Sequence, residues 1–342
     1  MQNPFTLTFG KEPFSFINRD YQSREIIENF TSDNPGFQAC IITGVRGSGK
    51  TVAMTSVANE LAKDKKWIVV NLNPERDLLN QLAAELSNRK GLLELFRDAK
   101  INLSVLGFGL EMDGVPPVTD IVVALRRMLE RITKEGKCVL ITIDEVSSTS
   151  QLREFASQFQ IFVREGLNVF MIMTGLYRNI SALQDSRNLT FLYRAPKLEL
   201  KPLNLVLMAE KYKAVFNLGD DDALEMAKAT KGYPFAFQAL GYICWQTGKP
   251  WKDVLPEYDA KLEDFVYDKI WSELSVKDRT VIKAICSSDD SKVESIREKA
   301  GIDSNTFTVY RKRLVKSGIV TSPVYGHLEL TLPRFSEFVA RQ

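Results

Sequence analysis

A glycine-rich octapeptide, set between an apolar run and a helical pattern, constrains the fold of this 342-residue chain more than any other feature. Residues 44–51 read Gly-Val-Arg-Gly-Ser-Gly-Lys-Thr. The run Ala39–Thr43 precedes them, and apolar residues recur at helical spacing from Val52 to Leu61. A strand that passes through a glycine-rich turn into a helix is typical of parallel α/β folds, so the sequence predicts an α/β protein.

Three further apolar runs in the first 200 residues resemble strands that are covered on both faces. They are Trp67–Asn71, Cys138–Ile143 and Val169–Met173, and polar or glycine residues bound each of them. Helical patterns separate the runs, notably after Lys50 and after Asp120. This alternation of strands and helices predicts a parallel sheet.

Two regions depart from the alternation. Residues 101–112 alternate apolar and polar side chains and contain glycines, so we expect an inserted hairpin or edge strand there. From Leu203 the pattern becomes helical, and Gly232-Tyr-Pro234 introduces a helix that continues from Phe235. Proline is favoured near a helix start, because its missing N–H group is no loss in the first turn.

The last 68 residues predict a separate unit of helices followed by a β-hairpin. The helical patterns cover 276–286, 293–299 and about 306–316, the last with Ser304 or Asn305 as its cap, and the strand-like pieces are Ile319–Thr321 and Leu328–Leu332. Three helices and a hairpin in this order are typical of a winged helix-turn-helix. We therefore expect a sheet domain at 1–202, a helical lid domain at 203–274 and a winged helix at 275–342.

The octapeptide matches the phosphate-binding pattern GxxxxGK[ST]. Its glycines let backbone N–H groups converge on phosphate oxygens at the start of a helix, where the helix dipole favours an anion. Lys50 is expected to reach the β- and γ-phosphates of a nucleoside triphosphate, and the Thr51 hydroxyl to bind Mg²⁺. Because a strand precedes the loop and an amphipathic helix follows it, the pattern predicts a nucleotide site.

Asp144 and Glu145 directly follow the run Cys138–Ile143. A phosphate-binding loop needs a second carboxylate at the end of a neighbouring strand to hold Mg²⁺ through water, and Asp144 is placed for this role. Glu145 is placed to polarise the attacking water as a general base. An Asp-Glu pair alone is a common loop start, but on the same sheet as the phosphate-binding loop it favours a catalytic interpretation.

Two further contacts to the γ-phosphate stay open at this level. Thr174 follows Val169–Met173 and is either a polar group near the γ-phosphate or a turn residue. Charge that develops on the γ-phosphoryl group requires a cation beyond Lys50. Arg194, at the expected end of a strand, is the first candidate, with a surface ion pair as its alternative, and Arg187 is the second.

Several enzyme classes are excluded by composition. His327 is the single histidine and follows a glycine in an expected turn, no GxSxG motif occurs, and HExxH metal sites need two histidines. The four cysteines, Cys40, Cys138, Cys244 and Cys286, form no CxxC pair and read as reduced thiols. Without a long apolar run or a signal-peptide pattern, the protein is expected to be cytoplasmic.

Two more motifs lie on either side of the predicted strands. Phe16-Ile-Asn-Arg19 resembles an F-x-G-R-x-x-E-L box, with Asn18 at the glycine and Gln22 at the glutamate of that pattern. Gly232-Tyr-Pro234 resembles a GxP motif. Together with the phosphate-binding loop and the predicted winged helix, these motifs resemble the AAA+-related STAND and archaeal-type ATPases, neighbours of the origin-recognition ATPases.

This resemblance implies a P-loop fold of the AAA+ type, with an added strand between the loop strand and the carboxylate strand. It also implies an ATP-hydrolysing switch that uses ATP or ADP with Mg²⁺. In the family the first box contacts adenine and ribose, and the proline of GxP packs on the nucleotide. The implied nucleotide-binding residues are Gly44, Val45, Arg46, Gly47, Ser48, Gly49, Lys50, Thr51, Val52, Arg19 and Pro234, with Lys50, Glu145 and Arg194 in catalysis and Thr51 and Asp144 at the metal.

The third C-terminal helical pattern carries four basic residues, Arg311, Lys312, Arg313 and Lys316. From Ser275 to the end the chain holds 12 Lys or Arg and 8 Asp or Glu, a net charge of +4. This charge is weaker than the usual footprint of tight DNA binding. The helix is therefore either a surface for double-stranded DNA or a charged face of a winged helix that contacts protein.

Three function classes follow from these patterns. The first is an ATP-dependent switch whose winged helix binds DNA. The second is a signalling ATPase whose winged helix docks a protein or another copy of the chain, or closes over its own nucleotide site. The third is a P-loop kinase or nucleotide transferase, which the winged helix and the GxP motif argue against.

Overall fold

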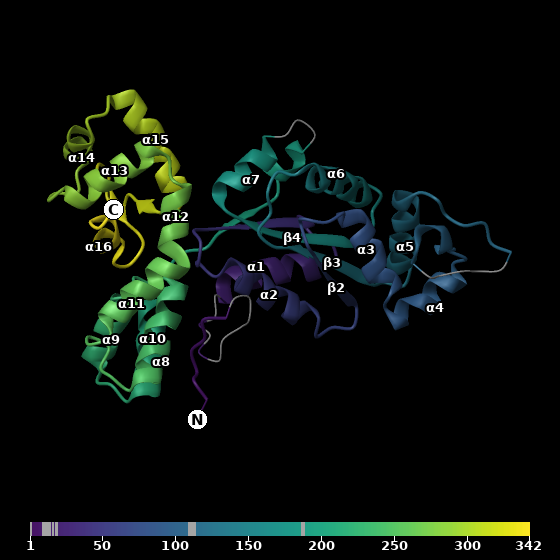
Figure 1. The fold of residues 1–342 in the computed structure, drawn as a ribbon. Coiled ribbons are helices and arrows are strands. Elements are labelled where there is room, and N and C mark those ends of the chain that lie inside the picture. Colours follow the sequence, from purple (N-terminus) through teal and green to yellow (C-terminus); the bar gives the residue numbers. More distant parts are fainter. Residues whose placement is uncertain (1, 9–14, 16, 18–19, 109–113, 186–188) are drawn as a thin grey trace. The chain divides into compact units, whose positions relative to one another are not determined.

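The computed structural model describes residues 2–8, 15, 17, 20–108, 114–185 and 189–342 (Figure 1). The chain folds into two compact units. The sheet unit holds Asp20–Thr43 and Lys50–Glu199. The helical unit holds Gly44–Gly49, Leu200–Gln342 and the described residues of Met1–Arg19. The phosphate-binding loop thus groups with the helical unit, although the residues on either side of it belong to the sheet unit.

The sheet unit is built on a five-stranded sheet in the order β2-β3-β4-β1-β5. All neighbouring strands run parallel, and their bounds are Ala39–Thr43 (β1), Trp67–Leu72 (β2), Cys138–Ile143 (β3), Val169–Gly175 (β4) and Lys197–Glu199 (β5). Every residue of β1, β3 and β4 is buried, which explains why these strands are continuous apolar runs. The four predicted strands are confirmed, and β4 lies between the loop strand β1 and the carboxylate strand β3.

Helices cover both faces of this sheet (Figure 1). On one face, rings of Phe30, Trp67 and Phe170 pack with centroid distances of 4.9 Å from Phe170 to each of the other two. The opposite face packs against helices of the central part of the chain. The described helices are α1 (Asp20–Thr31), α2 (Lys50–Leu61), α3 (Leu78–Ser87), α4 (Lys90–Asp98), α5 (Ile121–Lys134), α6 (Ser150–Arg164) and α7 (Tyr177–Gln184), with 3₁₀ helices at Ser104–Leu106 (η1) and Thr190–Tyr193 (η2).

The predicted hairpin or edge strand at 101–112 is wrong for the residues that the structure describes there. Residues 101–108 hold the 3₁₀ helix η1 and no strand, and residues 109–113 lie outside the described part. The buried Asn102 side chain accepts hydrogen bonds from the Ser104 N–H and hydroxyl and donates one to the Val115 carbonyl, 2.8 Å away. These local bonds turn the chain, so the alternating apolar residues enter the core from a loop.

The helical unit contains the remaining elements around one contiguous core. α10 begins at Pro234 as predicted, and the expected domain boundaries after 202 and 274 fall between elements. The three-domain division itself stays a prediction. The elements are α8 (Leu205–Phe216), α9 (Asp220–Lys228), α10 (Pro234–Thr247), α11 (Leu255–Leu262), a π-helical turn (Glu263–Tyr267), α12 (Asp268–Glu273), α13 (Val276–Ser287), α14 (Val293–Ala300), α15 (Ser304–Lys316), the antiparallel β6 (Val320–Thr321) and β7 (Glu329–Leu330), and α16 (Phe335–Val339).

The cap of α15 differs from the prediction. Asp303, rather than Ser304 or Asn305, precedes the helix and accepts hydrogen bonds from the backbone N–H groups of Asn305 and Thr306, each at 3.0 Å. A carboxylate at this position also favours the positive end of the helix dipole. The helix therefore starts at Ser304, one turn before the periodic apolar residues begin.

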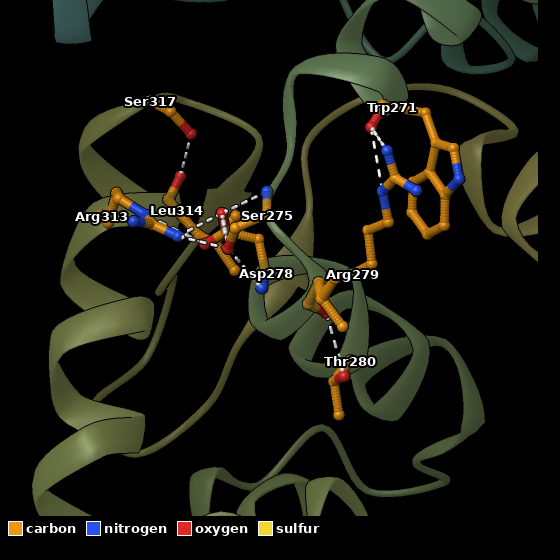
Figure 2. A network of polar contacts seen from close by, with 9 residues as sticks. Trp271, Ser275, Asp278, Arg279, Thr280, Arg313, Leu314 and Ser317 are labelled. Carbon is orange, nitrogen blue, oxygen red and sulfur yellow. Dashed lines mark hydrogen bonds and ion pairs between the residues drawn. The ribbon is translucent and has the colours of Figure 1, made fainter.

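Helices α13 and α15 are joined by an ion pair around Asp278 (Figure 2). The Asp278 side chain is only 5% exposed, and its Oδ1 accepts from Arg313 Nε at 3.0 Å. Its Oδ2 accepts from the Ser275 N–H and hydroxyl, which completes a capping box at the start of α13. Arg313 also donates to the Ser275 hydroxyl at 2.8 Å, so its guanidinium links the two helices while 49% of its side chain stays exposed.

We expect Arg313→Met to lower the free energy of unfolding by about 2 kcal/mol, because it leaves a buried carboxylate without its ion-pair partner. Lys312→Met, at an exposed position of the same helix, should change it by less than about 0.5 kcal/mol. Urea unfolding followed by circular dichroism measures both values. Equal effects of the two substitutions would contradict the role assigned to Arg313.

Candidate functional site

The phosphate-binding loop has the backbone that its glycines permit. Gly47 and Gly49 have φ angles of 76° and 84°, in the left-handed region that side chains disfavour. The Ser48 N–H turns into the loop and donates to the Val45 carbonyl at 3.2 Å. The helix α2 begins directly after the loop at Lys50, so its first N–H groups are oriented toward the loop.

Within the sheet unit, hydrogen bonds converge on the Asp144 carboxylate at the end of β3. The Thr51 hydroxyl, at the start of α2, donates to Asp144 Oδ2 at 2.7 Å. The Thr174 hydroxyl, at the end of β4, donates to Asp144 Oδ1. The Glu145 N–H donates to the same oxygen at 3.1 Å. The structure therefore brings together the two residues predicted to hold the metal.

Thr174 belongs to this group and is not an ordinary turn residue. It is the penultimate residue of β4 and is fully buried. Its hydroxyl donates to Asp144 and accepts from the Glu145 N–H at 3.1 Å, so it fixes both carboxylate residues. Of the two interpretations left open by the sequence, the structure favours the polar contact at the site.

Glu145 is held in a conformation that few non-glycine residues adopt. Its φ angle is 51°, in the left-handed region, and its side chain is exposed. The N–H of the next residue, Val146, donates to the Thr174 carbonyl at 2.8 Å. This bond fixes the backbone on the C-terminal side of Glu145. Such backbone conformations cost about 1–3 kcal/mol and persist where the surroundings determine them, often at functional sites.

These groups fit a magnesium ion by their chemistry. The Thr51 hydroxyl and the Asp144 carboxylate are hard oxygen donors 2.7 Å apart. Mg²⁺ is bound through one or two such protein groups, with waters and substrate phosphates completing its shell. Among the described residues, no group of three or more His, Cys, Asp or Glu side chains could hold a metal by itself. The donor set therefore suits a metal that arrives with a phosphate ligand.

Within the helical unit, the phosphate-binding loop packs against the start of α10. The Tyr233 hydroxyl donates to the Arg46 carbonyl, and the Phe235 N–H donates to the Gly47 carbonyl at 3.3 Å. A Cβ atom on Gly49 would lie 3.7 Å from Pro234 Cγ, so the proline of the predicted GxP motif borders the loop. The Arg46 guanidinium forms an ion pair with Glu273 of α12 at 3.5 Å.

The predicted cationic partner Arg194 does not have the expected place in the fold. Arg194 does not end a strand: it directly follows the 3₁₀ helix η2, it is exposed, and β5 begins only at Lys197. The apolar residues before it, such as Leu192, enter the core through this helical turn. Arg187, and Arg19 of the predicted adenine-contacting box, lie outside the described residues.

Of the four basic residues predicted on α15, Arg313 has a structural role through its ion pair with Asp278. Lys312 and Lys316 are exposed, and Arg311 is half-buried. No local pattern predicts the Asp278 pairing, because the two partners are 35 residues apart. The role of Tyr233 was not predicted for the same reason. Tyr233 lies inside the Gly232-Tyr-Pro234 motif, but it contacts the phosphate-binding loop only in the tertiary structure.

The cysteines are free thiols, and the histidine has a hydrogen-bond partner close to the β6–β7 turn. Burial raises the pKa of Cys40 and of Cys244 to about 12, so both thiols stay protonated at neutral pH. Both cysteines, with Cys138 and Cys286, are free thiols. His327 lies in the β6–β7 turn, and its Nδ1 is 3.0 Å from the hydroxyl of Ser291, which precedes α14. In the described part of the chain, the helices are too short or too polar to cross a bilayer.

We expect Gly47→Ala to lower the thermal unfolding midpoint more than Gly248→Ala does. Both glycines have positive φ angles, of 76° and 67°, so both substitutions cost about 1 kcal/mol of backbone strain. Only at Gly47 would the added methyl overlap the Tyr233 hydroxyl and approach its Cζ to 2.8 Å, whereas the space at Gly248 is open. Equal shifts of the unfolding midpoint in calorimetry would contradict this expectation and show that the Tyr233 side chain moves aside without a measurable cost in stability.

Two families match parts of the sequence. Residues 36–205 match a family described as AAA domain. Residues 264–339 match a family described as Domain of unknown function (DUF8462). No curated protein matches the chain. The first match covers all five strands and the whole of the predicted nucleotide-contacting loop.

Three solved structures are similar over nearly the whole chain. A Walker-type ATPase of Pyrococcus abyssi has a TM-score of 0.67 at 15% identity, over 94% of this chain and 95% of that one. The ORC2 protein of Aeropyrum pernix has a TM-score of 0.60 at 12% identity, over 95% and 94%. Cdc6p of Pyrobaculum aerophilum has a TM-score of 0.50 at 12% identity, over 98% and 96%. At these identities the likenesses show the fold alone, which is an α/β fold with a five-stranded parallel sheet.

Proposed function

We propose that this protein binds ATP with Mg²⁺ and hydrolyses it, through the phosphate-binding loop and the carboxylates at the end of β3. The hydrogen bond between Thr51 and Asp144 is the observation that carries this proposal. It joins the residue after the loop lysine to a carboxylate two strands away, as a P-loop site requires. The ORC2 structure of Aeropyrum pernix is described as ADPNP-ADP complexes, which supports nucleotide binding in this fold.

Each residue has a distinct part in the proposed reaction. The loop N–H groups and Lys50 bind the β- and γ-phosphates, and Pro234 borders the same loop. Thr51 and Asp144 hold Mg²⁺, which when bound neutralises charge on the phosphate oxygens. Glu145 polarises the attacking water, and Thr174 keeps both carboxylate residues in place. Arg194 remains the proposed cationic partner of the γ-phosphate, and Arg19 the proposed contact to the nucleoside.

We expect Lys50→Ala to abolish ATP binding, because it removes the cation that contacts the transferred phosphate. Glu145→Gln should retain ATP binding within about threefold but lower hydrolysis by at least about a hundredfold, since the amide cannot accept a proton. Isothermal titration and a phosphate-release assay measure the two quantities. Glu154→Gln, at an exposed position of α6, is the matched control for the second variant. Unchanged hydrolysis in Glu145→Gln would overturn its role as general base.

The nucleotide state is proposed to act as a switch on the C-terminal region. The helices α13, α14 and α15 and the strands β6 and β7 follow one another in the order of a winged helix-turn-helix. A ligand moves a conformational equilibrium only if it binds one state better than the other. ATP and ADP differ in the phosphate that the loop and Glu145 contact, so we propose that they favour different arrangements, as in STAND-type ATPases.

Double-stranded DNA is the proposed target of the winged helix. The basic residues of α15 other than Arg313 support this, as does the +4 charge of the region from Ser275 onward. The alternative is a protein partner or a second copy of the chain. It is supported by the exposed apolar residues Val309 on α15 and Val324 and Tyr325 at the β6–β7 turn, of which Tyr325 is fully exposed.

We expect a labelled DNA duplex to bind the protein with an affinity that falls as salt rises, because phosphate contacts release counterions. Arg311→Glu/Lys312→Glu should weaken binding by at least about tenfold at 100 mM salt. Lys211→Glu/Lys249→Glu changes the net charge equally at exposed positions outside this region and should change the affinity by less than about threefold. Fluorescence anisotropy of the labelled duplex measures the affinity of each variant with ATP, with ADP and without nucleotide. Nucleotide binding without any DNA binding would favour the protein-docking alternative.

A further inference from the structure

Two carbonyl groups of the phosphate-binding loop accept hydrogen bonds from the residues that begin α10. The Tyr233 hydroxyl donates to the Arg46 carbonyl. The Phe235 N–H donates to the Gly47 carbonyl at 3.3 Å. All of these residues belong to the helical unit, and the Tyr233 side chain is 5% exposed. The outer face of the loop is therefore fixed at two consecutive peptide groups.

Fixing a carbonyl also fixes the N–H group on the other side of the same peptide. A peptide is planar and trans, so its N–H points opposite to its C=O. With the Arg46 and Gly47 carbonyls directed to α10, the N–H groups of Gly47 and Ser48 point away from it. The Ser48 N–H indeed turns inward and donates to the Val45 carbonyl. The Ser48 N–H is thus used within the loop, and the Gly47 N–H faces the loop interior, where a phosphate would bind, with no carbonyl from these two peptides beside it.

The Tyr233 ring is seated closely enough on the loop to hold this arrangement. A Cβ atom on Gly47 would overlap the Tyr233 hydroxyl and lie 3.2 Å from Phe235 Cβ. Burial raises the pKa of Tyr233, so the hydroxyl remains a donor at every pH near neutrality. Neither contact needs a ligand, so the loop is oriented before any nucleotide arrives.

We propose that Tyr233 is a positioning residue of the nucleotide site, whose hydroxyl orients the Arg46–Gly47 peptide so that the loop presents its N–H groups to the nucleotide phosphates. This inference rests on the proposed ATP binding and deepens it. The neighbouring Pro234 is the residue implied by the GxP resemblance, whereas Tyr233 acts through the loop backbone and need not touch the nucleotide.

The test compares two tyrosine-to-phenylalanine substitutions in the full-length protein. Tyr233→Phe keeps the ring over Gly47 and removes only the hydroxyl. Tyr212→Phe is the matched control: Tyr212 is also buried in the helical unit, and its hydroxyl donates to a backbone carbonyl of α10, that of Phe237, at 2.8 Å. It makes this bond away from the phosphate-binding loop. Both variants lose one buried tyrosine hydrogen bond, so a general loss of stability should be similar in the two.

Binding of a fluorescent ATP analogue, with unlabelled ATP and adenosine as competitors, separates positioning from stability. Tyr233→Phe should weaken ATP binding about tenfold and leave adenosine binding unchanged, because only the phosphates contact the loop N–H groups. Tyr212→Phe should leave both affinities within about twofold. Unchanged ATP affinity in Tyr233→Phe, or an equal loss of ATP and adenosine affinity, overturns the inference.

A second measurement does not depend on nucleotide. Hydrogen–deuterium exchange of the nucleotide-free protein should be faster in peptides covering residues 44–49 for Tyr233→Phe, and unchanged there for Tyr212→Phe. Equal exchange of these peptides in the wild type and Tyr233→Phe overturns the inference even if the protein binds ATP. A wild-type protein that binds no ATP overturns the proposed function, and faster exchange in Tyr233→Phe would then still identify Tyr233 as the residue that orders the loop.

Discussion

The hydrogen bonds that converge on the Asp144 carboxylate are the interaction on which the candidate site depends. They come from three separate places in the sheet unit: the start of α2, the end of β4 and the turn after β3 itself. The parallel sheet, with β4 between β1 and β3, brings all three to one point, because parallel strands end at a common edge. The fully buried strands that form this edge also keep it rigid, which a site of oxygen donors needs.

The phosphate-binding loop has a different support. Its residues group with the helical unit, and the contacts that hold its carbonyls come from the start of α10. Glycine at position 47 serves two purposes there, since it allows the left-handed backbone and leaves room for the Tyr233 ring. The Arg46 side chain adds an ion pair to α12. The loop is thus in direct contact with helices of the helical unit, and these contacts support the proposed nucleotide-dependent switch.

The charge of α15 shows how a basic helix divides its side chains between packing and solvent. Arg313 pairs with the buried Asp278 and stacks on Tyr310, with the guanidinium carbon 4.6 Å from the ring centre. It links α15 to α13 with about half of its side chain exposed, and Lys312 and Lys316 are exposed as well. A count of basic residues therefore overstates the charge available to a nucleic acid. The exposed apolar residues at the β6–β7 turn, close in sequence to this helix, keep protein docking as the competing proposal.

The sequence by itself determined the strands β1 to β4, the helices α2 and α5 and the identity of the loop, because periodicity and glycine placement are local properties. It also predicted Asp144 and Glu145 from their position after a buried strand. It could not decide Thr174, whose role depends on the order of strands far apart in the chain, and it misjudged 101–112, where the Asn102 side chain turns the backbone. Only the tertiary structure joined Tyr233 to the loop and Arg313 to Asp278, because such contacts between distant residues depend on packing that leaves no local pattern in the sequence.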